Sequence, residues 1–172
     1  MDWLFIALRI VHIFTGVAWV GGAALFFFYI EPTINTLGPD AERFVDELVN
    51  QRKVPIYFLS ASTLNILFGL LLYWRDSGGL QLSWIESPTG LAFTIAGVSA
   101  VIAWAGGNVL IPRLLIGLGR IGAQLRAAGG PPSPELLGAM RATQERLRTV
   151  GMIDLVLLGV AVLGMATARY LA

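Results

Sequence analysis

The chain has no cysteine, and it has only one histidine and one lysine among its 172 residues. Without cysteine there are no disulfides, thiolate metal sites, iron–sulfur clusters or cysteine nucleophiles. One histidine is too few for a zinc or di-metal hydrolase, which needs several protein ligands. One histidine and four methionines are also too few to line a copper pathway. The sequence shows no phosphate-binding glycine loop and no Ser/His/Asp signature.

Charge is scarce as well: 13% of the residues are charged, 56% are hydrophobic, and the formal net charge is +1. These values exclude a disordered chain and are unusual for a soluble domain. The balanced charge gives no reason to expect a nucleic-acid partner. We therefore expect a lipid bilayer to be the environment of this chain.

Long apolar runs predict an all-α fold with four transmembrane helices in a single membrane domain. About 20 apolar residues in a helix are enough to cross the hydrocarbon core. The first run follows Asp2, lacks a basic flank and is too long for a signal peptide, so we expect it to be retained. The expected spans are residues 3–30, 55–74, 91–112 and 150–171.

Two amphipathic cytoplasmic helices are expected between the spans, at residues 39–54 and 134–149. Pro39-Asp40 has the composition of a helix start, and Ser133 is a good N-cap for the second of these helices. The third span should continue to about residue 127, with a kink near Pro112 and a break at residues 129–132. Trp74 and Trp84 are expected to anchor helix ends at the membrane interface.

The order of span, amphipathic helix and span occurs twice, which suggests two hairpins that arose by internal duplication. Trp19-Val20-Gly21-Gly22 in the first span is matched by Trp104-Ala105-Gly106-Gly107 in the third. Such a duplication would give two like-oriented hairpins related by an axis along the membrane normal.

The distribution of basic residues predicts the orientation, because positively charged loops stay in the cytoplasm. We therefore expect both long loops inside and both termini outside, in a plasma or equivalent inner membrane. The basic surface after residue 113 is expected to contact anionic headgroups or, alternatively, a protein partner. The loops carry Arg43, Arg52, Lys53, Arg113, Arg120, Arg126, Arg141, Arg146 and Arg148, whereas the other side carries Arg75 and Arg169.

Arg9 and His12 interrupt the first span and lie on one helical face, because they are three residues apart. Ionisable groups at membrane depth are costly and usually face a partner or a ligand. At 1.5 Å per residue, Arg9 and His12 lie about 9 and 14 Å from the outer end of this span. Met165 lies about 9 Å inside the outer end of the fourth span, with Arg169 near that end.

These side chains suit haem b, whose iron takes histidine or histidine and methionine, and whose propionates pair with arginine. His12 would be an axial ligand, alone or with Met165, and Arg9 and Arg169 would hold the propionates. Ligation by two histidines would require two protomers, since each chain has one. In the alternative interpretation, His12 hydrogen-bonds a neighbouring helix and Met165 is ordinary packing.

Three other positions in or near the spans also have two interpretations. The spacing of Gly16 and Trp19 would let a flat haem ring lie against this helix. The same two residues are equally consistent with close helix packing at Gly16 and burial of Trp19 in the core. Asp154, near the cytoplasmic end of the fourth span, is predicted to form an ion pair with Arg113. A proton relay through Asp154 is the alternative.

The run RIVHIFTGVAWVGGAALFF, residues 9–27, resembles the small four-helix membrane proteins grouped around the copper-resistance protein CopD. His12 followed seven residues later by Trp19 is also similar to the first helix of HemJ-type protoporphyrinogen oxidases. That resemblance implies that His12 binds haem. The functional intramembrane lysine of the HemJ type has no counterpart here, because Lys53 lies outside the spans. The resemblance thus implies a fold and a ligand rather than an activity.

The leading functional hypothesis is a haem-b-binding membrane protein in electron transfer or redox chemistry. The first alternative is a non-catalytic structural or assembly subunit of a larger membrane complex, in which the glycine-rich faces and the basic helix are contact surfaces. The second alternative is a small transporter. We expect a homo-oligomer or membrane-complex partners, and the sequence assigns no catalytic residue.

Overall fold

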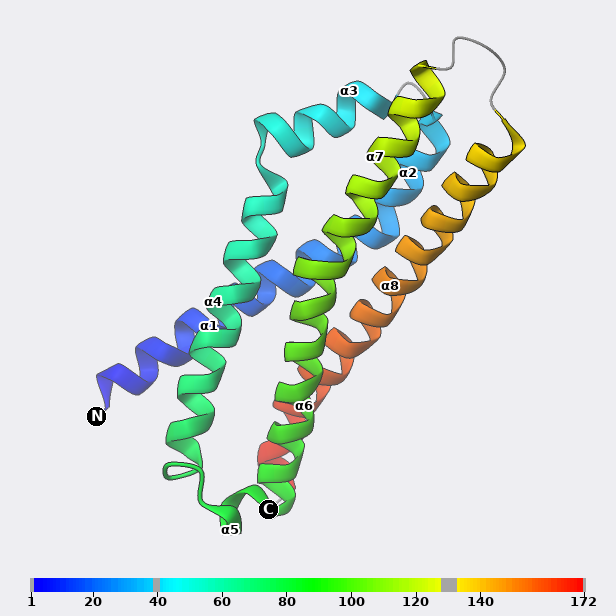
Figure 1. The fold of residues 1–172 in the computed structure, drawn as a ribbon. Coiled ribbons are helices and arrows are strands. Elements are labelled where there is room, and N and C mark those ends of the chain that lie inside the picture. The colour runs from blue at the N-terminus through cyan, green and yellow to red at the C-terminus, as the bar shows by residue number, and fades with distance from the viewer. Residues whose placement is uncertain (1, 39–40, 128–132, 172) are drawn as a thin grey trace.

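The computed structural model describes residues 2–38, 41–127 and 133–171. Within these ranges the chain is helical and contains no strand. Figure 1 shows long helices that run between two ends of the molecule. The N- and C-termini lie at the end that carries α5, and α3 lies at the opposite end. The predicted helix start at Pro39-Asp40 and the predicted break at residues 129–132 lie outside the described residues.

Four helices among the described residues are long and apolar enough to cross a membrane, consistent with an integral membrane protein. Two of them contain a π-helical turn and one ends in a 3-10 turn, and each still runs as one continuous helix. In chain order they are α1 (Trp3–Leu25) with η1 (Phe26–Ile30) and α2 (Glu31–Leu37); α4 (Val54–Asp76); α6 (Pro88–Ala105) with η4 (Gly106–Leu110) and α7 (Ile111–Ala127); and α8 (Pro134–Thr167) with η5 (Ala168–Tyr170).

Short elements connect these helices at the two ends. α3 (Ala41–Asp46) and the π-helical turn η3 (Glu47–Gln51) cross one end between α2 and α4 (Figure 1). α5 (Leu82–Ile85) joins α4 to α6 at the other end. The turn before α5 uses Gly78 and Gly79 at φ values of 62° and 84°, where a side chain would be strained.

Polar side chains fix where three of the helices begin. Asp2 accepts a hydrogen bond from the Phe5 backbone N–H at 3.1 Å, and Ser87 accepts one from Gly90 at 3.1 Å. Ser133 caps α8 in the same way, at 3.3 Å from the Leu136 nitrogen. Each cap satisfies a backbone donor that has no partner within its own helix.

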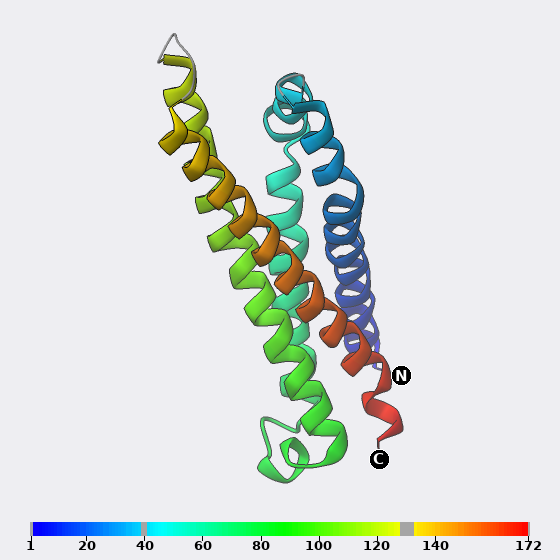
Figure 2. The same cartoon turned by 90° about the vertical axis from the view of Figure 1, so that its right-hand side faces the viewer.

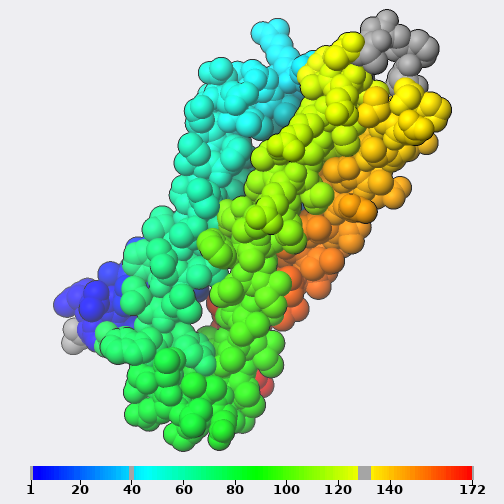
Figure 3. Space-filling model, in the orientation of Figure 1, coloured from blue at the N-terminus to red at the C-terminus, as the bar shows by residue number. Residues whose placement is uncertain are grey.

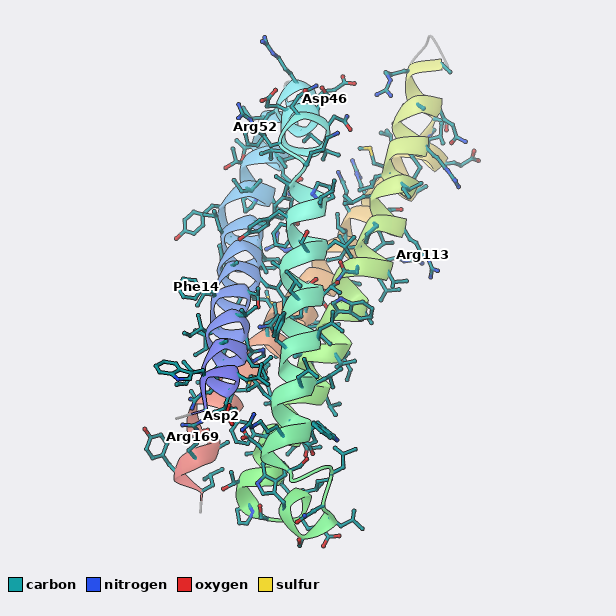
Figure 4. The ribbon with its side chains drawn as sticks, turned by 90° about the vertical axis from the view of Figure 1, so that its left-hand side faces the viewer. Asp2, Phe14, Asp46, Arg52, Arg113 and Arg169 are labelled. Carbon is teal, nitrogen blue, oxygen red and sulfur yellow. The ribbon has the colours of Figure 1, made fainter. Side chains whose placement is uncertain are left out.

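The closest packing joins α1 to α4, and α6 and α7 to α8, while α4 and α6 contact one another less extensively. Figure 2 shows α8 running along α6 and α7. Trp19, Ala61, Ala103 and Leu158 form the buried centre. Most other large apolar side chains face outward, as Phe14 does at 73% exposed (Figure 4). A small core under an apolar surface is what a lipid-embedded bundle requires.

The two π-helical turns in the long helices each precede a proline, Pro32 or Pro112. Proline has no N–H, so it cannot complete the hydrogen-bond ladder of an α-helix. In each π-helical turn, the backbone N–H of the residue before the proline donates a hydrogen bond to the carbonyl five residues earlier. These bonds run from Glu31 to Phe26 and from Ile111 to Gly106. A π-helical turn therefore lies where the sequence predicted a kink near Pro112.

The repeated features of the first and third helices need different alignments. Thirteen positions separate Trp19 from Pro32, but eight separate Trp104 from Pro112. No single alignment of the two helices therefore matches both the tryptophan–glycine motif and the π-helical turn with its proline. The internal duplication stays a prediction.

The helix formed by α6, η4 and α7 spans 40 residues. At 1.5 Å per residue this is about 60 Å, twice the thickness of a hydrocarbon core. α7 and the first half of α8 therefore project from the apolar part of the bundle.

Candidate functional site

A cavity of about 680 Å³ lies between α1, α4, α6 and α8, with α5 and η5 at one end. This volume is typical of pockets that hold cofactors and drug-sized ligands. The walls are mainly apolar. Every residue that the sequence analysis assigned to haem lines this one cavity, namely Arg9, His12, Gly16, Trp19, Met165 and Arg169.

The imidazole of His12 is held by α4. Its Nδ1 lies 3.0 Å from the backbone carbonyl oxygen of Asn65, and because a carbonyl only accepts, Nδ1 must carry the proton. In the neutral ring, Nε2 then has the free lone pair, and it forms no hydrogen bond within the described residues. Histidines that bind metals show this arrangement, with one nitrogen donating to the protein and the other left for the metal.

Asn65 completes the contact from α4. It is buried, at 6% exposed, and its side-chain amide donates to the His12 carbonyl at 2.7 Å. The same amide lies 3.3 Å from Nδ1 of His12, but that nitrogen already donates to the Asn65 carbonyl, so we count this second approach as a packing contact. Two reciprocal bonds between residues 53 positions apart therefore fix the orientation of the ring.

Two glycines make room for this pair. A Cβ at Gly69 would lie 2.9 Å from Cε1 of His12, so the ring sits directly on the surface of α4 at this position. A Cβ at Gly16 would lie 2.9 Å from the Asn65 amide nitrogen. Gly16 thus serves close packing between α1 and α4 and also lines the cavity.

Two arginines provide the positive charge of the cavity. Neither Arg9 nor Arg169 forms an ion pair with any described residue, although Asp76 also lines the cavity. The Arg9 guanidinium lies 5.5 Å from the centre of the Phe5 ring. Unpaired guanidiniums beside an apolar cavity favour an anionic group on whatever ligand it holds.

Aromatic side chains form the end of the cavity nearest α5. Trp84 stacks on Phe93 with ring centres 6.2 Å apart, and it meets Tyr73 edge-on at 5.4 Å. The Tyr73 hydroxyl is hydrogen-bonded to the Thr94 hydroxyl at 2.6 Å. Trp84, predicted as an interface anchor, is therefore also part of the cavity wall.

Asp154 and Arg113 are not brought together. Within the described residues Asp154 has no ion pair and no hydrogen bond, and its carboxylate lies against Gly106, the first residue of η4. Arg113 is exposed on α7 (Figure 4), where it lines a groove between α7 and α8 seven residues beyond Gly106. The expected ion pair is therefore not formed, because Asp154 packs against Gly106, and Arg113 lies seven residues, about 10 Å, farther along the helix.

A separate set of polar side chains joins α4 to the third long helix. The Trp104 indole N–H donates to the Thr63 hydroxyl at 3.1 Å, and the Asn108 amide donates to the Ser62 hydroxyl at 3.0 Å. These side chains do not line the cavity. Trp104 therefore acts in packing between helices, whereas Trp19 is buried and lines the cavity.

Sequence reasoning left out several residues of the site, and their signals differ. Asn65 was detectable as the one strongly polar residue in the second span, but its contact with His12 was not. Asp76, Tyr73 and Phe93 gave no signal, because they lie at a span boundary or in apolar runs, and Trp84 gave only the signal of an interface anchor. Gly69 resembles any other glycine in an apolar helix.

The described residues contain no group of three or more His, Asp or Glu side chains that could hold a metal ion. No protein-family model, curated protein or solved structure matches this chain.

Proposed function

We propose that this chain is a haem-b-binding integral membrane protein that acts in electron transfer or redox chemistry. The observation that carries the proposal is one cavity of about 680 Å³ that is lined by His12, Met165, Arg9 and Arg169. Positions 9 and 169 are far apart in the chain, so their meeting at one cavity is not a consequence of sequence spacing.

The protonation of His12 supports its role as an axial ligand. Since Nδ1 donates to the Asn65 carbonyl, Nε2 is the nitrogen available for iron. The hydrogen bond to a neighbouring helix, expected if His12 had only a structural role, thus also prepares the ring for ligation. Haem iron held in this way would supply reversible one-electron transfer.

The other residues of the cavity would bind and orient the group. Arg9 and Arg169 would neutralise the two propionates, because guanidinium–carboxylate pairs are strong, directional hydrogen bonds. Gly16 and Trp19 would form the wall along α1. Met165 is the candidate second ligand, and a five-coordinate iron held by His12 alone is the other arrangement that these side chains allow.

The proposal includes the placement of the chain in its membrane. We infer two hairpins, α1 with α4 and α6 with α8, in a plasma or equivalent inner membrane. Both termini would lie outside and α3, α7 and the start of α8 inside, because the basic residues concentrate at that end. A homo-oligomer, or partners in a membrane complex, would cover part of the exposed apolar surface of α1.

The resemblance of residues 9–27 to the CopD group and to the first helix of HemJ-type proteins supports the same ligand. It does not carry an enzymatic activity to this chain, because the chain has no lysine in a span. We therefore propose a haem protein without assigning it a substrate.

The test is the haem content of purified protein from cells supplied with haem precursor. His12→Ala should lose nearly all of the haem, whereas Met165→Leu should keep it with an altered spectrum. Phe14→Leu, on the lipid-facing side of α1, is the matched control and should keep full haem content. Equal haem in His12→Ala and the unchanged protein would overturn the assignment. A colourless protein that co-purifies with fixed neighbours would instead support the structural-subunit alternative.

A further inference from the structure

We propose that the groove between α7 and α8 binds the headgroup of an anionic phospholipid. This site is separate from the cavity around His12, and the proposal does not depend on haem. The groove encloses about 640 Å³ and is lined by residues of both helices and the end of η4. Figure 3 shows the surfaces of α7 and α8 meeting along this projecting end of the molecule.

The charges of the groove favour an anion. Arg113 on α7 and Arg146 on α8 both line it, and neither forms an ion pair with any described residue. Glu145 is the one acidic residue of the lining, so two guanidiniums face one carboxylate. Two guanidiniums from different helices can donate hydrogen bonds to separate oxygens of one phosphate group.

The position of the groove favours a lipid over a soluble anion. Arg113 directly follows Pro112, where the third apolar run ends, and the lining residues Thr149 and Val150 stand where the fourth begins. The two arginines therefore lie close to the membrane surface.

Apolar side chains continue the groove toward the membrane. Leu110 and Val150 line it on the membrane side of the arginines. A phosphate at the guanidiniums would thus have an apolar surface below it for acyl chains. Basic pockets between membrane helices on the cytoplasmic side recognise acidic lipid headgroups by this combination.

The experiment compares lipid binding by the full chain in detergent micelles, using native mass spectrometry. Phosphatidylglycerol and phosphatidylcholine with the same acyl chains are the two probes. The Arg113→Gln/Arg146→Gln protein should lose its preference for phosphatidylglycerol by about thirtyfold, since two arginines near a membrane surface contribute about 1 kcal/mol each. Arg120→Gln/Arg141→Gln removes the same charge from the same helices outside the groove, and it should keep the preference.

Several results would overturn the proposal. One is an unchanged preference in Arg113→Gln/Arg146→Gln, and another is an equal loss in both double variants, which would indicate general surface charge. Displacement of phosphatidylglycerol by excess inorganic phosphate would identify a free phosphate as the ligand instead of a lipid. If the unchanged protein bound phosphatidylglycerol and phosphatidylcholine equally, the groove would not be a site for anionic lipid, and a protein partner would be the remaining candidate. Helix content by circular dichroism checks folding, and if the double variant fails this check, Arg146→Gln alone should show an intermediate loss.

Discussion

His12 and Asn65 are joined by two reciprocal hydrogen bonds between α1 and α4. The ring Nδ1 donates to the Asn65 carbonyl at 3.0 Å, and the Asn65 amide donates to the His12 carbonyl at 2.7 Å. The pair fixes the tautomer and the orientation of the imidazole. A preorganised ring loses little entropy when it binds a metal, which is why such outer contacts raise affinity.

Replacing Gly69, which does not itself line the cavity, should displace the His12 ring. A Cβ at this position would lie 2.9 Å from Cε1 of His12, so the ring must move away from α4. Changes to the groups that position a metal-binding histidine cost about 10–100-fold in affinity. We therefore expect Gly69→Ala to weaken haem binding by that factor in a titration monitored at the Soret band. Gly159→Ala, where a Cβ would meet nothing within 4 Å, should bind as the unchanged protein does.

Neutralising either cavity arginine should lower the reduction potential of bound haem. The oxidised iron carries one more positive charge, so removing a nearby cation stabilises it relative to the reduced form. A unit charge 10–20 Å away at an effective dielectric constant near 20 corresponds to roughly 40–70 mV. Arg9→Gln and Arg169→Gln should each show a drop of this order in a redox titration at low ionic strength. Arg141→Gln, on the projecting part of α8, should leave the potential unchanged, and an increase in either cavity variant would contradict the propionate role.

The contact between Gly106 and Asp154 predicts a non-additive pair of substitutions. A Cβ at Gly106 would collide with the Asp154 carboxylate, so Gly106→Ala should destabilise the protein by about 1–3 kcal/mol. Asp154→Ala alone should cost little, because the carboxylate has no hydrogen bond or ion pair within the described residues. The double variant should be more stable than Gly106→Ala, since the collision is removed. Thermal unfolding in micelles measures all three, and simple additivity of the two changes would rule out this contact.

The close approach of α6 and α8 depends on Gly164. A Cβ there would lie 2.9 Å from the Ala96 Cβ and 3.4 Å from the Ala92 carbonyl oxygen. Gly164→Ala should therefore lower the free energy of unfolding by about 1–3 kcal/mol, because the Ala96 Cβ is attached directly to the α6 backbone and cannot move aside as a flexible side chain can. Gly159→Ala, in the same helix, should have no effect or a slightly stabilising one. Equal stability of the two variants would mean that the helices pack less closely than the structure has them.

The four long helices could be predicted from the sequence because hydropathy acts locally. Each apolar run is long enough to define its own span, and the N-capping side chain of Ser133 marks the start of α8. The grouping of Arg9 with His12 also follows from local spacing. These features depend on residues that are neighbours in the chain.

The details of the cavity could not be predicted, because they depend on how each helix is rotated about its axis. Outside the cavity, Asp154 and Arg113 were expected at one level in the membrane, but Asp154 packs against Gly106, about 10 Å along the helix from Arg113. The same uncertainty hid the contact of His12 with Asn65 and Gly69, which lie on another helix. Trp84 lines the cavity because α5 folds back onto α6, where the missing side chain of Gly90 leaves room for the Trp84 backbone carbonyl.

The most direct test of haem binding is the absorption spectrum of the purified protein, first air-oxidised and then reduced with dithionite. The account predicts a Soret band and, on reduction, sharpened α and β bands whose positions distinguish His12 with Met165 from His12 alone or from two histidines of paired protomers. A flat visible spectrum after expression with ample haem would contradict the account and return His12 to a packing role between α1 and α4.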